Sequence, residues 1–318
     1  MRKWTTLFLL TVTLFPFSRS LADPLPNVHD LLRAASKGDI NAQFMLGVAY
    51  EFGRGVAQDF AEAARWHQKA ADAGNPGAQA HLGNLYADGK GLQRDQTAAL
   101  KWYLRAAVQG DSVAQTNLGC MYFNGGGGLQ RDYNEAARWF TKAAAQHNPL
   151  AEANLATLYS EGLGLPRDPD AAANLYLEAA ERGNLYSQAR LAWIYQHGVG
   201  RPRDLVESLK WNRTAAQRGY PPALNNLGYL YEHGLGVQRD FPQAAKLYCQ
   251  AAGAKLSEAQ HNWETIHSNI DGIPEDCEKA ALWLAKVAPQ GLANMGESVE
   301  AGPKEPASNS TATIAYEH

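Results

Sequence analysis

The chain has 318 residues, of which 45% are hydrophobic and 19% are charged. These fractions are those of a folded protein and exclude an intrinsically disordered chain. Its 29 basic and 32 acidic side chains give a formal net charge of -3, so no global basic field indicates nucleic-acid binding. Three cysteines are too few and too scattered for a disulfide framework, and the sequence leaves open whether Cys249 pairs with Cys277.

Residues 1–22 have the pattern of a secretory signal peptide. Arg2 and Lys3 precede an apolar run over residues 7–17, which is too short for a comfortable membrane span. Residues 20–22 then supply the small side chains that a signal peptidase reads. We expect cleavage after residue 22 and a periplasmic or secreted mature protein without a transmembrane span. The alternative is an uncleaved anchor.

A helical pattern then recurs with a period of 36 residues, or 37 where a glycine-rich turn is one residue longer. Each of six full units is marked by a leucine: Leu46, Leu82, Leu118, Leu155, Leu191 and Leu227. In the first helix of the second unit, the recurring residues are Ala78, Leu82, Leu85 and Tyr86. They lie at i, i+4, i+7 and i+8, a spacing that predicts one buried helix face. The chain is therefore predicted to be an array of helical hairpins.

This period divides the chain into segments. Residues 27–38 have the pattern of the second half of a unit and are predicted to form an N-terminal capping helix. Residues 39–255 hold the six full units. Residues 256–291 keep only part of the pattern and are predicted to form a degenerate seventh unit that caps the C-terminal end. Residues 292–318 are small, polar and aperiodic, and we expect a disordered tail.

A glycine follows the leucine inside the first helix of four units, at Gly47, Gly83, Gly119 and Gly228. Glycine within a helix costs about 1 kcal/mol relative to alanine. Its recurrence predicts close approach of a neighbouring helix backbone at this position.

An aspartate recurs one residue before each predicted second helix: Asp59, Asp95, Asp132, Asp168, Asp204, Asp240 and Asp276. A carboxylate there can accept hydrogen bonds from the exposed backbone N–H groups of the first turn. This column predicts structural helix caps rather than a metal or catalytic site. Glu62, Glu135, Glu207 and Gln243 follow three residues later and are expected to complete capping boxes.

The second helix carries a tryptophan column at Trp66, Trp102, Trp139 and Trp211, followed by paired alanines. A large ring beside small residues is typical of core packing. The column is therefore predicted to be buried.

At these residues the chain resembles the Sel-1-like repeat family, a branch of the tetratricopeptide superfamily. The matching pattern is A-x3-LG-x2-Y-x2-G-x-G-x3-D-x3-A-x2-W-x3-AA-x2-G, over roughly residues 31–291. The resemblance implies an all-α fold, a right-handed α-solenoid of antiparallel helix pairs that acts as a scaffold for protein–protein interaction. Bacterial members are often exported and act in envelope biogenesis, exopolysaccharide regulation, stress responses or host contact.

In a curved array the first helices line the inner face, so their non-core positions are expected to form a partner-binding groove. The candidate residues are His81, Asn84, Asn117, Asn154, Arg190, Trp193, Asn226 and Tyr229. Asparagine amides suit the backbone of an extended peptide, and Trp193 and Tyr229 add the aromatic area that is common at interaction hot spots. The partner expected from this groove is a peptide segment or an envelope protein. The alternative is that the asparagines bond neighbouring helices within the solenoid.

A column of arginines precedes the capping aspartates, at Arg94, Arg131, Arg167, Arg203 and Arg239. Such an edge could engage an anionic polysaccharide or peptidoglycan, which gives a second hypothesis of an envelope-binding component. The alternative is a solvated edge whose arginines pair with nearby carboxylates.

Motifs of common enzymes are missing from the sequence. It has no S-x-x-K or K-T-G motif, so a penicillin-binding or β-lactamase-like enzyme stays only a residual hypothesis. It also has no H-E-x-x-H motif and no phosphate-binding G-x-x-x-x-G-K-[ST] loop. His197 and His233 repeat one unit apart, but no further ligands lie at suitable spacing. We therefore expect no catalytic residue, no metal and no cofactor.

Overall fold

The computed structural model describes residues 27–269 and 273–287, and within them the chain forms fifteen α-helices and no strand. The predicted signal peptide (1–22) and tail (292–318) lie outside the described residues. Among the described helices, none has the length and apolarity needed to cross a bilayer. The all-α solenoid predicted from the repeats is confirmed.

Helix α1 (Val28–Ser36) packs against α2 and stands alone at the N-terminal end, as expected for a capping helix. The first helices of the seven units are α2 (Ile40–Phe52), α4 (Pro76–Asp88), α6 (Ser112–Asn124), α8 (Pro149–Glu161), α10 (Leu185–His197), α12 (Pro221–His233) and α14 (Ser257–Asn269). The second helices are α3 (Phe60–Asp72), α5 (Gln96–Val108), α7 (Tyr133–Ala144), α9 (Pro169–Glu181), α11 (Leu205–Gln217), α13 (Phe241–Gly253) and α15 (Cys277–Val287).

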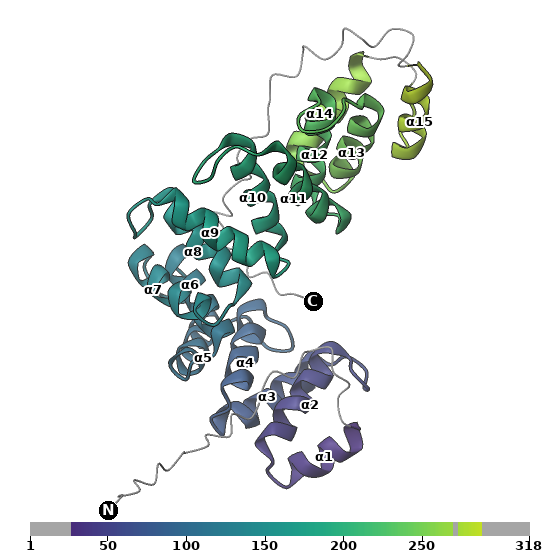
Figure 1. Cartoon of the computed structure of the whole chain (residues 1–318). Coiled ribbons are helices and arrows are strands. Elements are labelled where there is room, and N and C mark those ends of the chain that lie inside the picture. The colour runs from purple at the N-terminus through teal and green to yellow at the C-terminus, as the bar shows by residue number, and fades with distance from the viewer. Residues whose placement is uncertain (1–26, 270–272, 288–318) are drawn as a thin grey trace, which may run out of the picture.

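The helices stack in chain order. In the first six units each first helix packs on its own second helix, and each second helix packs on the first helix of the next unit. In the seventh unit α15 packs on α13. Figure 1 shows the resulting elongated, curved array, with α1 and α15 at opposite ends. Helix α2 also contacts α4, and α4 contacts α6, so consecutive first helices lie close together. This closeness puts α2, α4 and α6 on the inner side of the curve.

The aspartate column begins the second helices. Each of the seven carboxylates accepts from a backbone N–H two or three residues later, as Asp59 does from Ala61 and Glu62 at 2.9 and 3.0 Å. The expected capping box is wrong. The N–H of Asp59 donates to the carbonyl of Tyr50 in the preceding helix at 2.9 Å, so it is not available to the Glu62 side chain. Glu62 instead pairs with Arg65.

The helix glycines make room for aromatic rings. A Cβ built on Gly83 would lie 2.6 Å from Cε1 of Tyr103, and one on Gly119 would lie 2.6 Å from Cε1 of Phe140. The expected close approach of a helix backbone is therefore wrong for these glycines, because a ring of the same unit fills the space. Alanine replaces the glycine in two units: the ring position holds the smaller Asn212 in the unit of Ala192, but Tyr176 in the unit of Ala156.

The tryptophan column is less buried than predicted. Trp211 is 9% exposed, but Trp66, Trp102 and Trp139 are only half-buried. A cation three residues later lies over each of these three rings, at 3.9 Å for Lys69, 4.6 Å for Arg105 and 4.1 Å for Lys142. The fully buried column is the next residue: His67, Tyr103, Phe140, Tyr176, Asn212 and Tyr248. One residue turns a helix by about 100°, which carries the following side chain into the core.

The C-terminal cap is held by a disulfide. Cys249 of α13 is bonded to Cys277 of α15 across a sequence separation of 28 residues, which answers the pairing that the sequence left open. Cys120 is a free thiol buried in α6.

Candidate functional site

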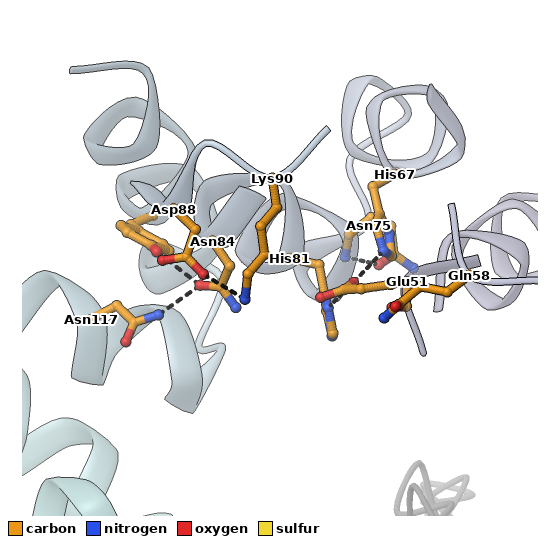
Figure 2. A network of polar contacts seen from close by, with 11 residues as sticks. Glu51, Gln58, His67, Asn75, His81, Asn84, Asp88, Lys90 and Asn117 are labelled. Atoms are coloured by element: carbon orange, nitrogen blue, oxygen red, sulfur yellow. Dashed lines mark hydrogen bonds and ion pairs between the residues drawn. The ribbon is translucent and has the colours of Figure 1, made fainter. Parts of the chain in front are cut away.

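The predicted groove is largely closed, because its two columns face each other across the junctions between units. Asn117 of α6 donates to Asn84 of α4 at 2.9 Å, and the Tyr103 hydroxyl donates to the same Asn84 oxygen at 2.8 Å (Figure 2). Asn84 and Asn117 are 7% and 3% exposed. The alternative, that the asparagines bond neighbouring helices, is confirmed for this pair.

Three more groove candidates are withdrawn from solvent or used within the fold. Arg190 is 2% exposed, and its guanidinium lies 5.5 Å from the ring centroids of Tyr176 and Trp193. Asn226 is also buried. Asn154 is half-buried, with its amide nitrogen 3.7 Å from the Cys120 sulfur. An asparagine ladder open to a peptide is therefore wrong, because consecutive units pack along this face.

Two groove candidates keep an accessible face. Trp193 of α10 and Tyr229 of α12 are half-buried, and each stacks on a histidine four residues later. The ring centroids lie 4.5 Å apart for Trp193 and His197, and 4.1 Å apart for Tyr229 and His233. We call these four residues the stacked-ring surface. They occupy the same positions in two consecutive units.

Both histidines of the stacked-ring surface are held in one tautomer. Nδ1 of His197 lies 3.0 Å from the Trp193 carbonyl, and Nδ1 of His233 lies 3.0 Å from the Tyr229 carbonyl. A carbonyl only accepts, so each Nδ1 carries the proton and each Nε2 is left as an acceptor. The histidines that repeat one unit apart are therefore stacking partners of Trp193 and Tyr229.

The arginine column has a structural role. Nε of Arg94, Arg167, Arg203 and Arg239 donates to a carbonyl seven residues earlier, at 2.8–3.1 Å, and so closes the end of the first helix. In the longer third unit, Arg131 instead lies 3.3 Å from the Tyr133 hydroxyl. Four of the five arginines bond the backbone rather than neighbouring carboxylates, and all five residues are exposed. Binding of an anionic polymer to this edge stays a prediction.

A cluster that the sequence did not single out lies at the junction of the first two units. Oε2 of Glu51 in α2 is 2.9 Å from Nε2 of His67 in α3 and 2.8 Å from Nδ1 of His81 in α4 (Figure 2). The two imidazole rings stack with centroids 5.0 Å apart, and Phe44 lies beside both. Of the groove candidates, His81 therefore belongs to this cluster.

The cluster strongly changes the protonation of its members. Burial raises the pKa of the Glu51 carboxyl, but the hydrogen bonds and charges of His67 and His81 outweigh it and bring the pKa down to about 2. Burial lowers the pKa of His67 to about 4, although its bond to Glu51 acts in the opposite direction. At neutral pH the cluster thus contains a carboxylate and a neutral His67.

The sixth unit repeats this arrangement with a tyrosine. Glu232 and Tyr248 occupy the positions of Glu51 and His67, and the Tyr248 hydroxyl donates to Oε2 of Glu232 at 2.7 Å. Burial and the neighbouring carboxylate raise the pKa of Tyr248 well above its ordinary value. A glutamate in a column that is alanine, phenylalanine, serine or glutamine in the other full units was the available sequence signal.

A second group with metal-ligand side chains lies between the third and fourth units. Glu152 is 0% exposed and lies 3.1 Å from the Arg182 guanidinium and 3.8 Å from Nδ1 of His147. Burial raises the pKa of Glu152, and the nearby Arg182 opposes that rise. The Arg182 guanidinium lies beside the Glu152 carboxylate, where a bound metal ion would have to lie.

The sequence matches the model of the Sel1 repeat over residues 40–75, 76–111, 112–148, 149–184, 185–220, 221–255 and 270–292. Two solved structures are similar in sequence and in fold. A protective antigen of uropathogenic Escherichia coli that displays an SLR fold is 35% identical over 82% of this chain, with a TM-score of 0.65. The chain spans 56% of that antigen's length. A Sel1 repeat protein from Oxalobacter formigenes is 28% identical over 71% of this chain and 97% of its own, with a TM-score of 0.62. No curated protein matches the sequence.

Proposed function

Because the chain belongs to the Sel1 repeat family, whose members are generally scaffolds for protein–protein interaction, we propose that it is an exported scaffold. Its partner is a protein segment that binds the stacked-ring surface. The observation that carries this assignment is the recurrence of an accessible aromatic–imidazole pair at the same positions of α10 and α12.

The chemistry of the stacked-ring surface suits a protein segment. Trp193 and Tyr229 offer large apolar area, and stacking on His197 and His233 restricts both rings before a partner arrives. Rigid aromatic side chains lose little entropy on binding, which favours them at hot spots. The two acceptor nitrogens, Nε2 of His197 and Nε2 of His233, suit hydrogen bonds from backbone N–H groups of the segment.

Two features support export. The first 22 residues have a signal-peptide pattern, and Cys249 is bonded to Cys277. Disulfides persist in oxidising compartments such as the periplasm or the extracellular space. The similar E. coli protein is a protective antigen, which favours a role at the bacterial envelope or in host contact. Edman sequencing of the protein from periplasmic and culture fractions should start at Asp23, and an intact N-terminus in the cytoplasmic fraction would contradict export.

Capture from envelope extract tests the binding surface. We compare the wild-type chain with the Trp193→Ala/Tyr229→Ala double variant and with Trp102→Ala. Trp102 is a matched control, because it is also half-buried and stacked but lies on a second helix. We expect the double variant to lose the proteins that wild type and Trp102→Ala retain, with helix content unchanged by circular dichroism.

A variant with Arg94, Arg131, Arg167, Arg203 and Arg239 all changed to glutamine separates the surface from the arginine edge. It should keep the captured proteins, because four of these five arginines bond the backbone of their own first helix. The proposal is wrong if the stacked-ring variant retains every partner, or if only the arginine variant loses them.

A further inference from the structure

Three side chains that favour metal ions converge on one point between the first and second units. Glu51, His67 and His81 each offer one ligand atom, and these atoms lie within 4.8 Å of one another. We propose that they form a binding site for a divalent transition-metal ion such as Zn²⁺. Two imidazole nitrogens and one carboxylate oxygen are a donor set that zinc uses when its fourth position is taken by water.

The spacing of the donors is close to what the ion requires. In a tetrahedral zinc site with bonds of about 2.0–2.2 Å, neighbouring ligand atoms are about 3.3–3.5 Å apart. Both nitrogens now lie 2.8–2.9 Å from Oε2 of Glu51. An outward shift of roughly half an ångström therefore makes room for the ion.

The position of the cluster provides both an enclosure and an entrance. The side chain of His67 is 0% exposed and that of Glu51 is 11% exposed, whereas His81 is 22% exposed. The ion can enter past His81, where the fourth position meets water. The Phe44 and Phe52 rings lie beside His81, with ring centroids 5.6 and 6.2 Å from that of the imidazole. Figure 2 shows the three side chains converging from separate helices.

Binding of the ion does not change the number of protons on His67 and His81. In the arrangement described above, each imidazole donates an N–H to the Glu51 carboxylate. When the ion binds, the proton of each ring moves to its other nitrogen, so no proton is lost from either imidazole. Nδ1 of His67 has no hydrogen-bond partner among the described residues, and the ring therefore has one unpartnered nitrogen in either state. A ligating histidine without a second-shell partner binds about 10–100-fold more weakly, so we expect micromolar rather than nanomolar affinity.

The charge balance also favours a cation. The Glu51 carboxylate neutralises one of the two positive charges of the ion. Asp111, which caps α6, lies close enough to His81 for the charges of these two side chains to interact. The second group of this type, around Glu152, differs because Arg182 already supplies the positive charge there. Only the cluster at α2, α3 and α4 therefore carries the proposal.

The repeats provide substitutions that the fold already accepts. His81→Asn places in the second unit the residue that the third unit has as Asn117, and it removes one ligand. His147→Asn is a matched control, because it makes the same change in the other histidine–glutamate group. Both variants and the wild type are prepared without a histidine tag.

Competition for Zn²⁺ against a chromogenic chelator tests the site in the full-length protein. We expect wild type and His147→Asn to take up one ion with the same affinity, and His81→Asn to bind it at least 10-fold more weakly. Zinc should also raise the midpoint of thermal unfolding of wild type and His147→Asn but not of His81→Asn. Equal zinc affinity in wild type and His81→Asn, or an equal loss in His147→Asn, would overturn the proposal.

Discussion

Glycines in the turns either only adopt a left-handed backbone conformation or also allow two units to approach closely. The sequence pattern does not distinguish the two cases. Gly91 has φ +68°, and a Cβ there would lie 2.3 Å from the carbonyl carbon of Phe60 in the preceding unit. Gly110 has φ +96°, but nothing lies within 4 Å of the position of its Cβ. Both residues use the left-handed region, and only Gly91 also allows two units to approach each other.

These two glycines give a matched pair of alanine substitutions. Gly110→Ala should cost about 1–2 kcal/mol, because an L-residue must enter the left-handed region. Gly91→Ala should cost about 1–3 kcal/mol more, since its Cβ also overlaps the Phe60 backbone. Urea unfolding of both variants measures the difference, and equal destabilisation would show that the contact with Phe60 is unimportant.

The Glu51 cluster predicts the sign of the pH dependence of the metal-free chain. His67 has its folded pKa lowered to about 4, so the unfolded chain binds that proton first and stability falls as the pH drops from about 6.5 to about 4. Glu51 has its folded pKa lowered to about 2, so stability falls further as the pH drops from about 4.5 to about 2. At about 1.4 kcal/mol per pKa unit, the two lowered pKa values together correspond to a loss of at most about 7 kcal/mol.

Urea midpoints measured in a chelator across this pH range check that sign. His67→Tyr is the informative variant, because the sixth unit already pairs Tyr248 with Glu232 at the same positions. It should remove the loss of stability between about pH 6.5 and about pH 4. A wild-type chain whose stability is constant, or rises, on acidification would contradict the assigned protonation states.

In four units, an arginine of the arginine column donates a hydrogen bond to a carbonyl near the end of the first helix. Arg167 donates to the Ser160 carbonyl at 3.0 Å, and in the first unit Gln58 makes the equivalent bond to the Glu51 carbonyl at 2.8 Å. Arg167→Ala should cost about 0.5–1.5 kcal/mol, whereas Arg167→Gln should recover most of it. Chemical denaturation of both variants decides the matter. If the glutamine variant were as unstable as the alanine variant, the positive charge of Arg167 and not its hydrogen bond to Ser160 would stabilise the helix end.

The last element of the array depends on the disulfide. Helix α15 is joined to α13 by the bond between Cys249 and Cys277, which spans 28 residues. In the chain-entropy account a loop of this length contributes about 3–4 kcal/mol. Cys277→Ser should therefore increase amide hydrogen exchange in α14 and α15 and leave α2–α11 protected, because each unit contacts only its neighbours. Uniform loss of protection across all units would contradict this local effect.

The elements were predictable from the sequence because their signals are local. Helix stripes, the capping aspartates and the terminal glycines each act within a few residues, and the structure has them at the expected positions. The groove was not predictable in the same way. Whether Asn117 meets solvent or Asn84 depends on how closely consecutive first helices pack, and a one-unit pattern does not contain that distance. For the same reason the grouping of Glu51, His67 and His81 was not predicted, since they come from three helices.

For the whole molecule, the repeated residues build the array and the departures from the repeat differ from unit to unit. The first two units hold the Glu51 cluster, and the fifth and sixth units hold the stacked-ring surface. A solenoid keeps such local features independent, because its stability comes from contacts between neighbours. The central claim is that the stacked-ring surface contacts a protein partner.

Site-specific photocrosslinking in the producing cells tests that claim most directly. A benzophenone amino acid replaces Tyr229 in one variant and Trp102, on a second helix, in the other. On irradiation, we expect a discrete protein adduct from position 229 and none from position 102. No adduct from position 229, or the same adduct from both positions, would contradict the claim.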